Sequence, residues 1–352
     1  MLLSDFFRRE NNNLDLIRLL LASVVIIGHV PAFKTVSPDY VDFMTKVFPF
    51  TYSGALAVKA FFFVSGLLVT NSILSRGNWK TYIISRAFRI YPALIFVSVC
   101  VVAFCWFITS ATPSEYIHSA MRYLRKIITM DFQYHLEGVS FVSETSSNGG
   151  KYATTVNGSI WTVPLEVKMY VTLLAIYFIA VSLKLQKASL LVVFSLLSLA
   201  PLLLSQPLMG GGTNEEETFL LAPFFAGSVL AVLKDQVRIN WQLVVGFVFL
   251  YCVVKNEAIR HWICYVAVPL ALVWVSSLPI VRQIRIKKDI SYGVYVWGWF
   301  VQVYIQYLFP NLSHLMYIVV CLAIVIPVAT FSAIFIEEPC MRIAKKINAK
   351  LA

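Results

Sequence analysis

The stretch that decides the fold is LDLIRLLLASVVIIGHV, residues 14–30, an apolar run that carries one arginine and one histidine. If the run is a helix, the step from Arg18 to His29 completes about three turns, so both side chains project from one face, roughly 16 Å apart along the axis. Ionisable groups inside a membrane span are costly and usually face a partner or a cavity. The pair therefore predicts a polar path that enters a membrane.

The composition places the whole chain in the membrane class. Of 352 residues, 59% are hydrophobic and only 13% are charged, which is more apolar side chain than a soluble domain can bury. We predict an all-α, polytopic membrane protein, one transmembrane domain over residues 1–352, with a bundle of about ten helices. The predicted spans are 14–33, 53–75, 89–110, 161–183, 187–205, 218–233, 241–254, 259–278, 290–309 and 315–336.

The basic residues predict the orientation of these spans. With the N-terminus in the cytoplasm, most of the 29 Lys and Arg fall in cytoplasmic loops, as the positive-inside rule requires. We therefore expect both termini to be cytoplasmic, with only a short basic tail after the last span. This bias accounts for the net charge of +11, so we expect no nucleic-acid binding.

The longest loop, residues 111–160, is then extracytoplasmic. Ile117, Met121, Leu124 and Ile128 recur at helical spacing within it, which predicts an amphipathic helix lying on the outer leaflet. The loop is either a lid over a site or a tolerated surface insertion. The six cysteines lie in or beside spans without metal or disulfide spacing, so we expect no metal site.

His29 and Glu166 are the candidate catalytic residues. Imidazole titrates near neutrality, and His29 lies in the outer part of its span, so it suits a general base or a nucleophile. Glu166, in SIWTVPLEVKMY (159–170), is expected at a similar depth, where it would orient His29 or itself act as the base. The plainer alternative is that both groups are interface residues. Pro31 predicts that the first helix bends or ends near His29.

Three arginines are candidates for binding phosphate near the cytoplasm. Arg86 and Arg89, in RAFRIYP (86–92), share a helix face at the expected start of the third span and could act as a fork, since guanidinium binds phosphate bidentately. Arg18 is expected at the same membrane face, oriented by Asp15. The alternatives are snorkelling for Arg18 and membrane anchoring for the other two arginines.

Four further residues are expected to line the substrate path. Thr162 and Tyr170 follow one stripe with Glu166, at i, i+4 and i+8, and Trp161 precedes them. Ser65 lies within FFFVSGLLVTNS (61–72), where the small pair Ser65-Gly66 is also typical of close helix packing. Ser291, in SYGVYVWGW (291–299), is a candidate helix cap.

These motifs resemble, in their order, the acyltransferase-3 family of integral membrane O-acyltransferases. The matching stretches are LDLIRLLLASVVIIGH, FFFVSGLL, RAFRIYP, SIWTVPLEVKMY, SYGVYVW and EEP at 337–339. The resemblance implies acetyl-CoA or a related acyl-CoA as donor, and a cell-surface glycan or lipid-linked saccharide as acceptor, in a bacterial cytoplasmic membrane. It also implies that Arg18 and His29 are essential, with Arg86, Arg89, Trp161 and Glu166 in support. The family often has His where Gly298 stands here, so no step can use a histidine there.

A second function class stays open on the sequence. Ten spans with intramembrane Arg, His and Glu also fit a secondary transporter or a lipid or glycan flippase. No internal repeat is evident in the hydropathy or the motifs. For the acyltransferase, His29 acts either as a general base on the acceptor hydroxyl or through a covalent acyl-histidine.

Overall fold

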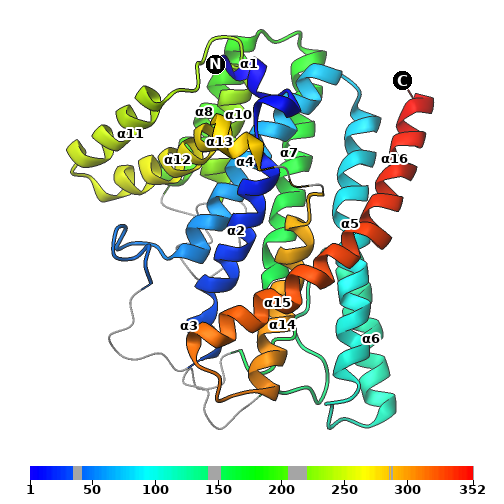
Figure 1. Cartoon of the computed structure of the whole chain (residues 1–352). Coiled ribbons are helices and arrows are strands. Elements are labelled where there is room, and N and C mark those ends of the chain that lie inside the picture. Colours follow the sequence, from blue (N-terminus) through cyan, green and yellow to red (C-terminus); the bar gives the residue numbers. More distant parts are fainter. Residues whose placement is uncertain (35–41, 142–151, 205–219, 285, 287, 352) are drawn as a thin grey trace. The chain divides into compact units, whose positions relative to one another are not determined.

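The computed structural model describes residues 1–34, 42–141, 152–204, 220–284, 286 and 288–351, and this part of the chain is built from helices (Figure 1). It divides into two compact units, each assembled from segments far apart in the sequence. Unit 1 comprises Met1–Leu21, Val47–Trp79 and Leu165–Lys287, and unit 2 comprises Ala22–Lys46, Lys80–Pro164 and Lys288–Ala352. The all-helical prediction is confirmed for the described residues.

Unit 1 is organised around α4, which is buried on nearly all sides. Its helices are α1 (Leu3–Phe6), η1 (Arg9–Asn11), the first part of α2 (Leu14–Gly28), α4 (Ser53–Arg76), most of α7 (Thr162–Ser182), α8 (Lys187–Leu204), α10 (Leu221–Val232), α11 (Trp241–Val253), α12 (Glu257–Ser276) and α13 (Pro279–Gln283). An apolar cluster that includes Phe6, Phe63 and Leu270 joins α1, α4 and α12 into one core.

Two glycines bring α4 and α10 into backbone contact. A Cβ added at Gly66 would lie 1.9 Å from the carbonyl oxygen of Phe224, and one at Gly227 would lie 2.2 Å from that of Phe63. Neither position therefore admits a side chain, and the small residues let the two helix axes approach closely. Close helix packing, one interpretation of the Ser65-Gly66 pair, is confirmed for Gly66.

Unit 2 is organised around α14 and α15, which pack against each other. Its helices are the last part of α2, α3 (Val30–Phe33), α5 (Trp79–Cys105), α6 (Pro113–Ile128), η2 (Ser159–Trp161), α14 (Ser291–Leu308), α15 (His314–Ser332), the π-helical turn η3 (Ala333–Glu337) and α16 (Glu338–Leu351). The segment after residue 336, predicted as a short basic tail, is helical, because η3 and α16 continue the last helix to Leu351. Asn348 of α16 donates to Ser85 of α5 at 3.1 Å.

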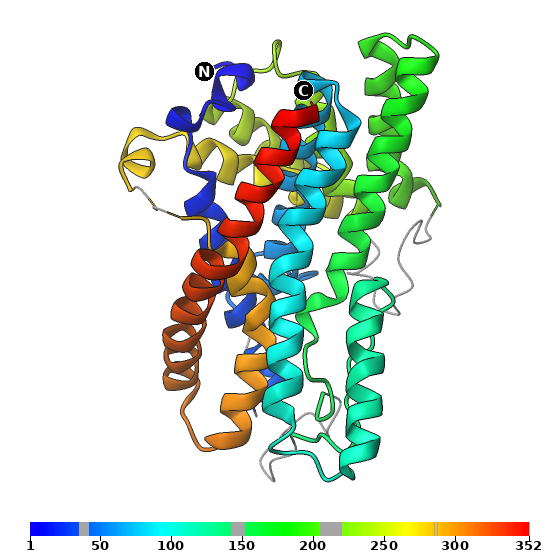
Figure 2. The same ribbon diagram turned by 90° about the vertical axis from the view of Figure 1, so that its right-hand side faces the viewer.

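The helix predicted within the long loop forms, but it does not stand apart from the bundle. Figure 2 shows α6 running alongside α5, and hydrogen bonds from Tyr116 to Val102 (2.6 Å) and from Tyr91 to Ile128 (3.2 Å) fix the two helices antiparallel. The predicted amphipathic helix therefore packs along α5, and its place on the outer leaflet stays a prediction. A different row of α6 side chains packs against the protein. Met121 and most of the apolar row predicted from the sequence are exposed. Residues 142–151 of the loop lie outside the described residues.

Six helical segments of the described chain are long and apolar enough to cross a membrane. They are Leu14–Phe33, Ser53–Arg76, Trp79–Cys105, Ser159–Ser182, Glu257–Ser276 and His314–Leu351. Each of the ten predicted spans overlaps a helix, but α8, α10 and α11 are shorter apolar helices, and α14 is not among the six. The chain thus has the helices of a multi-pass membrane protein, while the count of ten spans and the cytoplasmic termini stay predictions.

Candidate functional site

His29 lies at a break in the first membrane helix. The α-helix α2 ends at Gly28, and the short α3 begins at Val30 with Pro31 in its first turn, as Pro31 predicted. The backbone N–H of His29 still donates to Val25 at 3.1 Å, so the residue closes the last turn of α2. Its side chain is half-buried, and Nδ1 is fully covered by protein.

An aromatic side chain of α14, Trp299, forms one wall against His29. The two rings meet edge to face with centroids 5.1 Å apart. The indole Nε1 donates to the carbonyl of Thr155 at 3.1 Å, and a Cβ at Gly158 would lie 2.7 Å from the indole ring. Phe33 also packs edge-on against it, at 4.8 Å. Trp299 is thus fixed from several directions, and its position limits where the imidazole can lie.

Gln302, one turn further along α14, is the polar neighbour of His29. It is fully buried, its Nε2 donates to the carbonyl of Ile26 at 2.8 Å, and its own carbonyl accepts from Tyr317 at 2.8 Å. Among the described residues, neither Gln302 Oε1 nor His29 Nδ1 has a partner in full hydrogen-bond geometry. An imidazole N–H and an amide oxygen are a matching donor and acceptor, so a small ring rotation would satisfy both atoms.

A buried cation lies in the same part of unit 2. Lys34, directly after α3, donates to Gln306 at 3.2 Å and to the carbonyl of Pro310 at 2.9 Å. Its ammonium also lies 5.3 Å from the ring centre of Tyr317, the residue that donates to Gln302. Burial lowers the pKa of Lys34. Lys34 thus ties the segment after His29 to α14 and α15.

Three predicted residues come together in unit 1. Tyr170 donates to Oε1 of Glu166, and Ser65 of α4 donates to the same oxygen at 3.3 Å. The hydroxyls of Ser65 and Tyr170 are themselves 2.8 Å apart. The i, i+4 stripe on α7 is therefore confirmed for Glu166 and Tyr170. The orientation of His29 by Glu166 stays a prediction.

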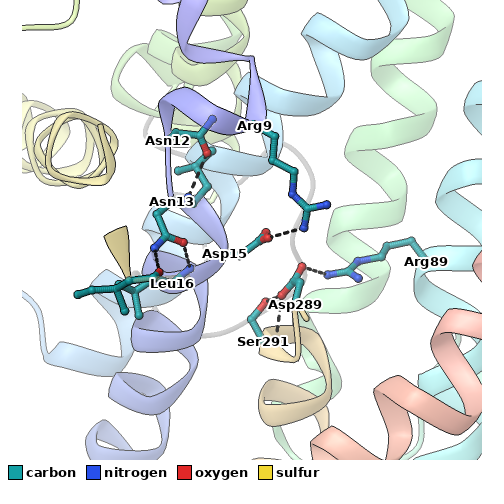
Figure 3. A network of polar contacts seen from close by, with 10 residues as sticks. Arg9, Asn12, Asn13, Asp15, Leu16, Arg89, Asp289 and Ser291 are labelled. Carbon is teal, nitrogen blue, oxygen red and sulfur yellow. Dashed lines mark hydrogen bonds and ion pairs between the residues drawn. The ribbon is translucent and has the colours of Figure 1, made fainter. Parts of the chain in front are cut away.

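Arg18 lies on α2 in unit 1, half-buried, one turn into the helix that Asn13 caps. The Asn13 side chain accepts from the backbone N–H of Leu16 at 3.2 Å, which explains why the helix begins there (Figure 3). Asp15, the residue expected to orient Arg18, forms an ion pair with Arg9 at 3.1 Å. The orientation of Arg18 by Asp15 stays a prediction.

Arg89 is held by carboxylates in unit 2. Figure 3 shows its guanidinium directed at Asp289, and the two groups are 2.5 Å apart. Glu337 in η3 lies 4.0 Å from the same guanidinium, which also lies 5.9 Å from the ring centre of Tyr292. Asp289 also accepts from the backbone N–H of Ser291 at 3.1 Å, so it supplies the cap of α14 that was predicted for Ser291.

The other predicted residues of unit 2 lie on α5 and near the start of α7. Arg86 and Arg89 are well inside α5, because this helix begins at Trp79 and not near residue 89 as predicted. The hydroxyl of Thr162 lies 2.7 Å from that of Tyr295 on α14. Trp161 is the last residue of η2, half-buried. Asn157, just before η2, donates to the carbonyl of Val296 at 2.9 Å.

Sequence reasoning missed Gln302, Trp299, Asp289 and Glu337. One signal was available for Gln302, since it and Gln306 form an i, i+4 polar pair inside an otherwise apolar run. The pairing of Arg89 with Asp289 joins residues 200 positions apart, and no local pattern indicates it.

Comparison with known proteins places this arrangement in a family. A model described as "Acyltransferase domain", for the family Acyl_transf_3, matches residues 11–336. The chain is 25% identical over 309 residues to "O-acetyl transferase" of Shigella phage Sf6, covering 83% of this chain and 85% of that protein. It is 30% identical over 165 residues to "Nodulation protein 10" of Rhizobium leguminosarum bv. viciae, covering 47% and 43%. No solved structure matches the chain.

Proposed function

Since the chain belongs to the acyltransferase-3 family, we propose that it is a multi-pass membrane O-acyltransferase that takes an acetyl group from cytoplasmic acetyl-CoA. The proposed acceptor is a hydroxyl of a cell-surface glycan or a lipid-linked saccharide, and the proposed location is the bacterial cytoplasmic membrane. The similarity to a phage protein named O-acetyl transferase, over most of both chains, supports acetyl as the transferred group.

The observation that carries the proposal is the setting of His29. The imidazole lies where α2 breaks, half-buried against Trp299, with Nδ1 covered and Gln302 as its polar neighbour. A general base needs one ring nitrogen directed at the reacting proton and the other held by an acceptor. Gln302, whose Nε2 donates to the carbonyl of Ile26, is proposed to supply that acceptor through its Oε1.

In the proposed reaction, Nε2 of His29 removes the proton of the acceptor hydroxyl while the hydroxyl oxygen attacks the thioester carbonyl. The new C–O bond forms, the C–S bond breaks, and the CoA thiolate leaves with the proton returned from the imidazolium. Gln302 and Trp299 act as positioning residues. Glu166, held by Tyr170 and Ser65, is proposed to stabilise the imidazolium, and Trp161 and Thr162 are proposed to line the acceptor path.

The phosphates of the donor are proposed to bind Arg18, Arg86 and Arg89. Because Asp289 already lies 2.5 Å from Arg89, a phosphate must compete with this carboxylate for the guanidinium. We therefore propose that Arg89 also has a supporting part, holding α5 beside α14 and η3. The Arg86→Ala variant is expected to weaken acetyl-CoA binding.

The decisive experiment measures CoA thiol release by the purified protein with acetyl-CoA and a surface-glycan acceptor. His29→Ala is expected to lower kcat by about 10²–10⁴-fold, the usual share of a general base, with acetyl-CoA binding retained. His118→Ala, on the exposed face of α6, is the matched control and is expected to keep wild-type activity.

Two outcomes would contradict the proposal. Normal transfer by His29→Ala would exclude the histidine, and absence of thiol release by the wild-type protein with every acceptor would favour a transporter. Acyl-histidine detected by mass spectrometry in a reaction lacking acceptor would replace direct transfer by the covalent route.

A further inference from the structure

A polar pocket in unit 2, separate from the residues discussed so far, opens beside the α5–α6 hairpin. It has a volume of about 440 Å³, in the range of small-molecule sites. It forms where the chain that follows α6 returns to the turn between α5 and α6. Its polar lining includes Ser119, Gln133, His135, Glu137, Ser140 and Thr154.

The backbone around this pocket is firmly held. Gly138 accepts from the N–H of Ser110 at 3.0 Å, and the hydroxyl of Thr109 donates to the carbonyl of Glu137 at 2.7 Å. The hydroxyl of Ser119 accepts from the N–H of Glu137 at 3.1 Å. Gly138 has φ +68°, and a Cβ there would lie 2.3 Å from the nitrogen of Ala111, so only glycine fits. The pocket wall is thus preorganised.

Several side-chain groups of the pocket remain open to a ligand. Among the described residues, no hydrogen bond engages the Glu137 carboxylate, the Ser140 hydroxyl or Oε1 of Gln133. Nδ1 of His135 contacts the hydroxyl of Thr154 at 2.9 Å, which leaves Nε2 for a ligand. Most of these groups accept hydrogen bonds or can both donate and accept them. The formal charge among the lining residues is the negative charge of Glu137. This set suits a ligand rich in hydroxyl groups and disfavours a phosphate or an acidic sugar.

The pocket is connected to His29 through one short segment. Thr154 lines the pocket, the carbonyl of the next residue, Thr155, accepts from Trp299, and Trp299 packs on His29. A ligand that contacts Thr154 therefore touches the segment that holds Trp299, the side chain against which His29 packs.

From these contacts we propose that the pocket is the acceptor subsite and binds a neutral sugar ring by its hydroxyls, with Glu137 as the main acceptor. This assignment rests on the proposed O-acyltransferase function, in which the acceptor is a saccharide. It predicts specificity for uncharged sugars and places binding in a set of residues distinct from His29 and Glu166.

Saturation-transfer NMR on the full chain in lipid nanodiscs tests the pocket without turnover. The probes are the methyl glycosides of glucose, galactose, mannose and rhamnose. At least one is expected to bind the wild-type protein and the His29→Ala variant equally. The double variant Glu137→Gln/Ser140→Ala is expected to weaken that binding by about tenfold or more. Asp131→Asn removes the same charge six residues before Glu137, outside the pocket, and is expected to leave binding unchanged.

The results separate the two proposals. Equal binding by the double variant, or no binding of any probe by the wild-type protein, overturns the subsite even if thiol release is observed. Lack of thiol release together with probe binding that depends on Glu137 overturns the acyltransferase function and leaves a saccharide site. A glucuronide that binds more tightly than the neutral probes contradicts the charge argument.

Discussion

His29, the proposed base, is half-buried, and its Nδ1 is covered by protein. Its candidacy was predictable, because an imidazole followed by Pro31 in an apolar run indicates both an unusual group and a helix break. Gln302 and Trp299 were not predictable as its neighbours. They lie on α14, about 270 residues later, and only the packing of unit 2 brings them to α2.

The Gln302→Glu variant tests the positioning role of this residue. A carboxylate beside the imidazole favours the imidazolium, so the acidic limb of the kcat–pH profile is expected to move to higher pH. A residue with a merely structural role would change activity without moving this limb. Gln306→Glu, one turn further along α14, adds the same charge beside Lys34 and is expected to leave the limb in place. An unmoved limb in Gln302→Glu would contradict the assignment.

Helix ends were less predictable than helices. Each apolar run contains a helix, yet α5 begins at Trp79, ten residues before the predicted start, because Lys80, Ser85 and Arg86 lower the hydropathy of its first turns. For the same reason α16 was not predicted as a helix: its basic residues lower its hydropathy, so the segment was predicted as a tail. Both polar segments are stabilised by tertiary contacts, such as Asn348 with Ser85, that a hydropathy pattern does not contain.

The carboxylate of Asp289 joins two elements, and its removal tests this link. In Asp289→Asn the amide oxygen still caps α14, but the charge opposite Arg89 is lost. The Arg89 and Asp289 side chains are only 23% and 16% exposed, so the loss is expected near the lower end of the range for a broken buried pair, about 3 kcal/mol. The midpoint of thermal unfolding in detergent, followed by tryptophan fluorescence, measures it.

Asp15→Asn is the matched control for this prediction. It also removes a carboxylate from an ion pair, but its partner Arg9 is 83% exposed, and exposed pairs contribute at most about 1 kcal/mol. Equal losses in the two variants would show that the Arg89 pair is no stronger than a surface contact.

For the molecule as a whole, the sequence predicted a membrane protein and the order of its helices, but not its division into two units. Each unit gathers segments from both halves of the chain. As a result, the motifs quoted along the sequence belong to different units. Ser65, Glu166 and Tyr170 meet in unit 1, while His29 and Arg89 lie in unit 2 with partners from the last quarter of the chain. The spacing of residues along the sequence does not indicate to which unit each residue belongs.

The orientation in the membrane is a prediction at the same scale. The distribution of Lys and Arg places both termini in the cytoplasm and the α5–α6 turn outside. Green fluorescent protein fused after Ala352 is therefore expected to fluoresce, and alkaline phosphatase fused after Ala111 is expected to be active. The reverse pattern would invert the topology and would place the polar pocket on the cytoplasmic side.

The close backbone approach of α4 and α10 at Gly66 and Gly227 has a consequence for how the protein is made. At 12 residues, α10 is about 18 Å long, well short of the roughly 30 Å hydrocarbon layer. A helix of that length gains little free energy by entering the lipid alone. It stays in the membrane when a partner helix already presents a surface that fits it. Here α4 is that partner and is translated much earlier. The glycine contact therefore sets an order of biogenesis, in which α4 must be inserted before the ribosome delivers α10.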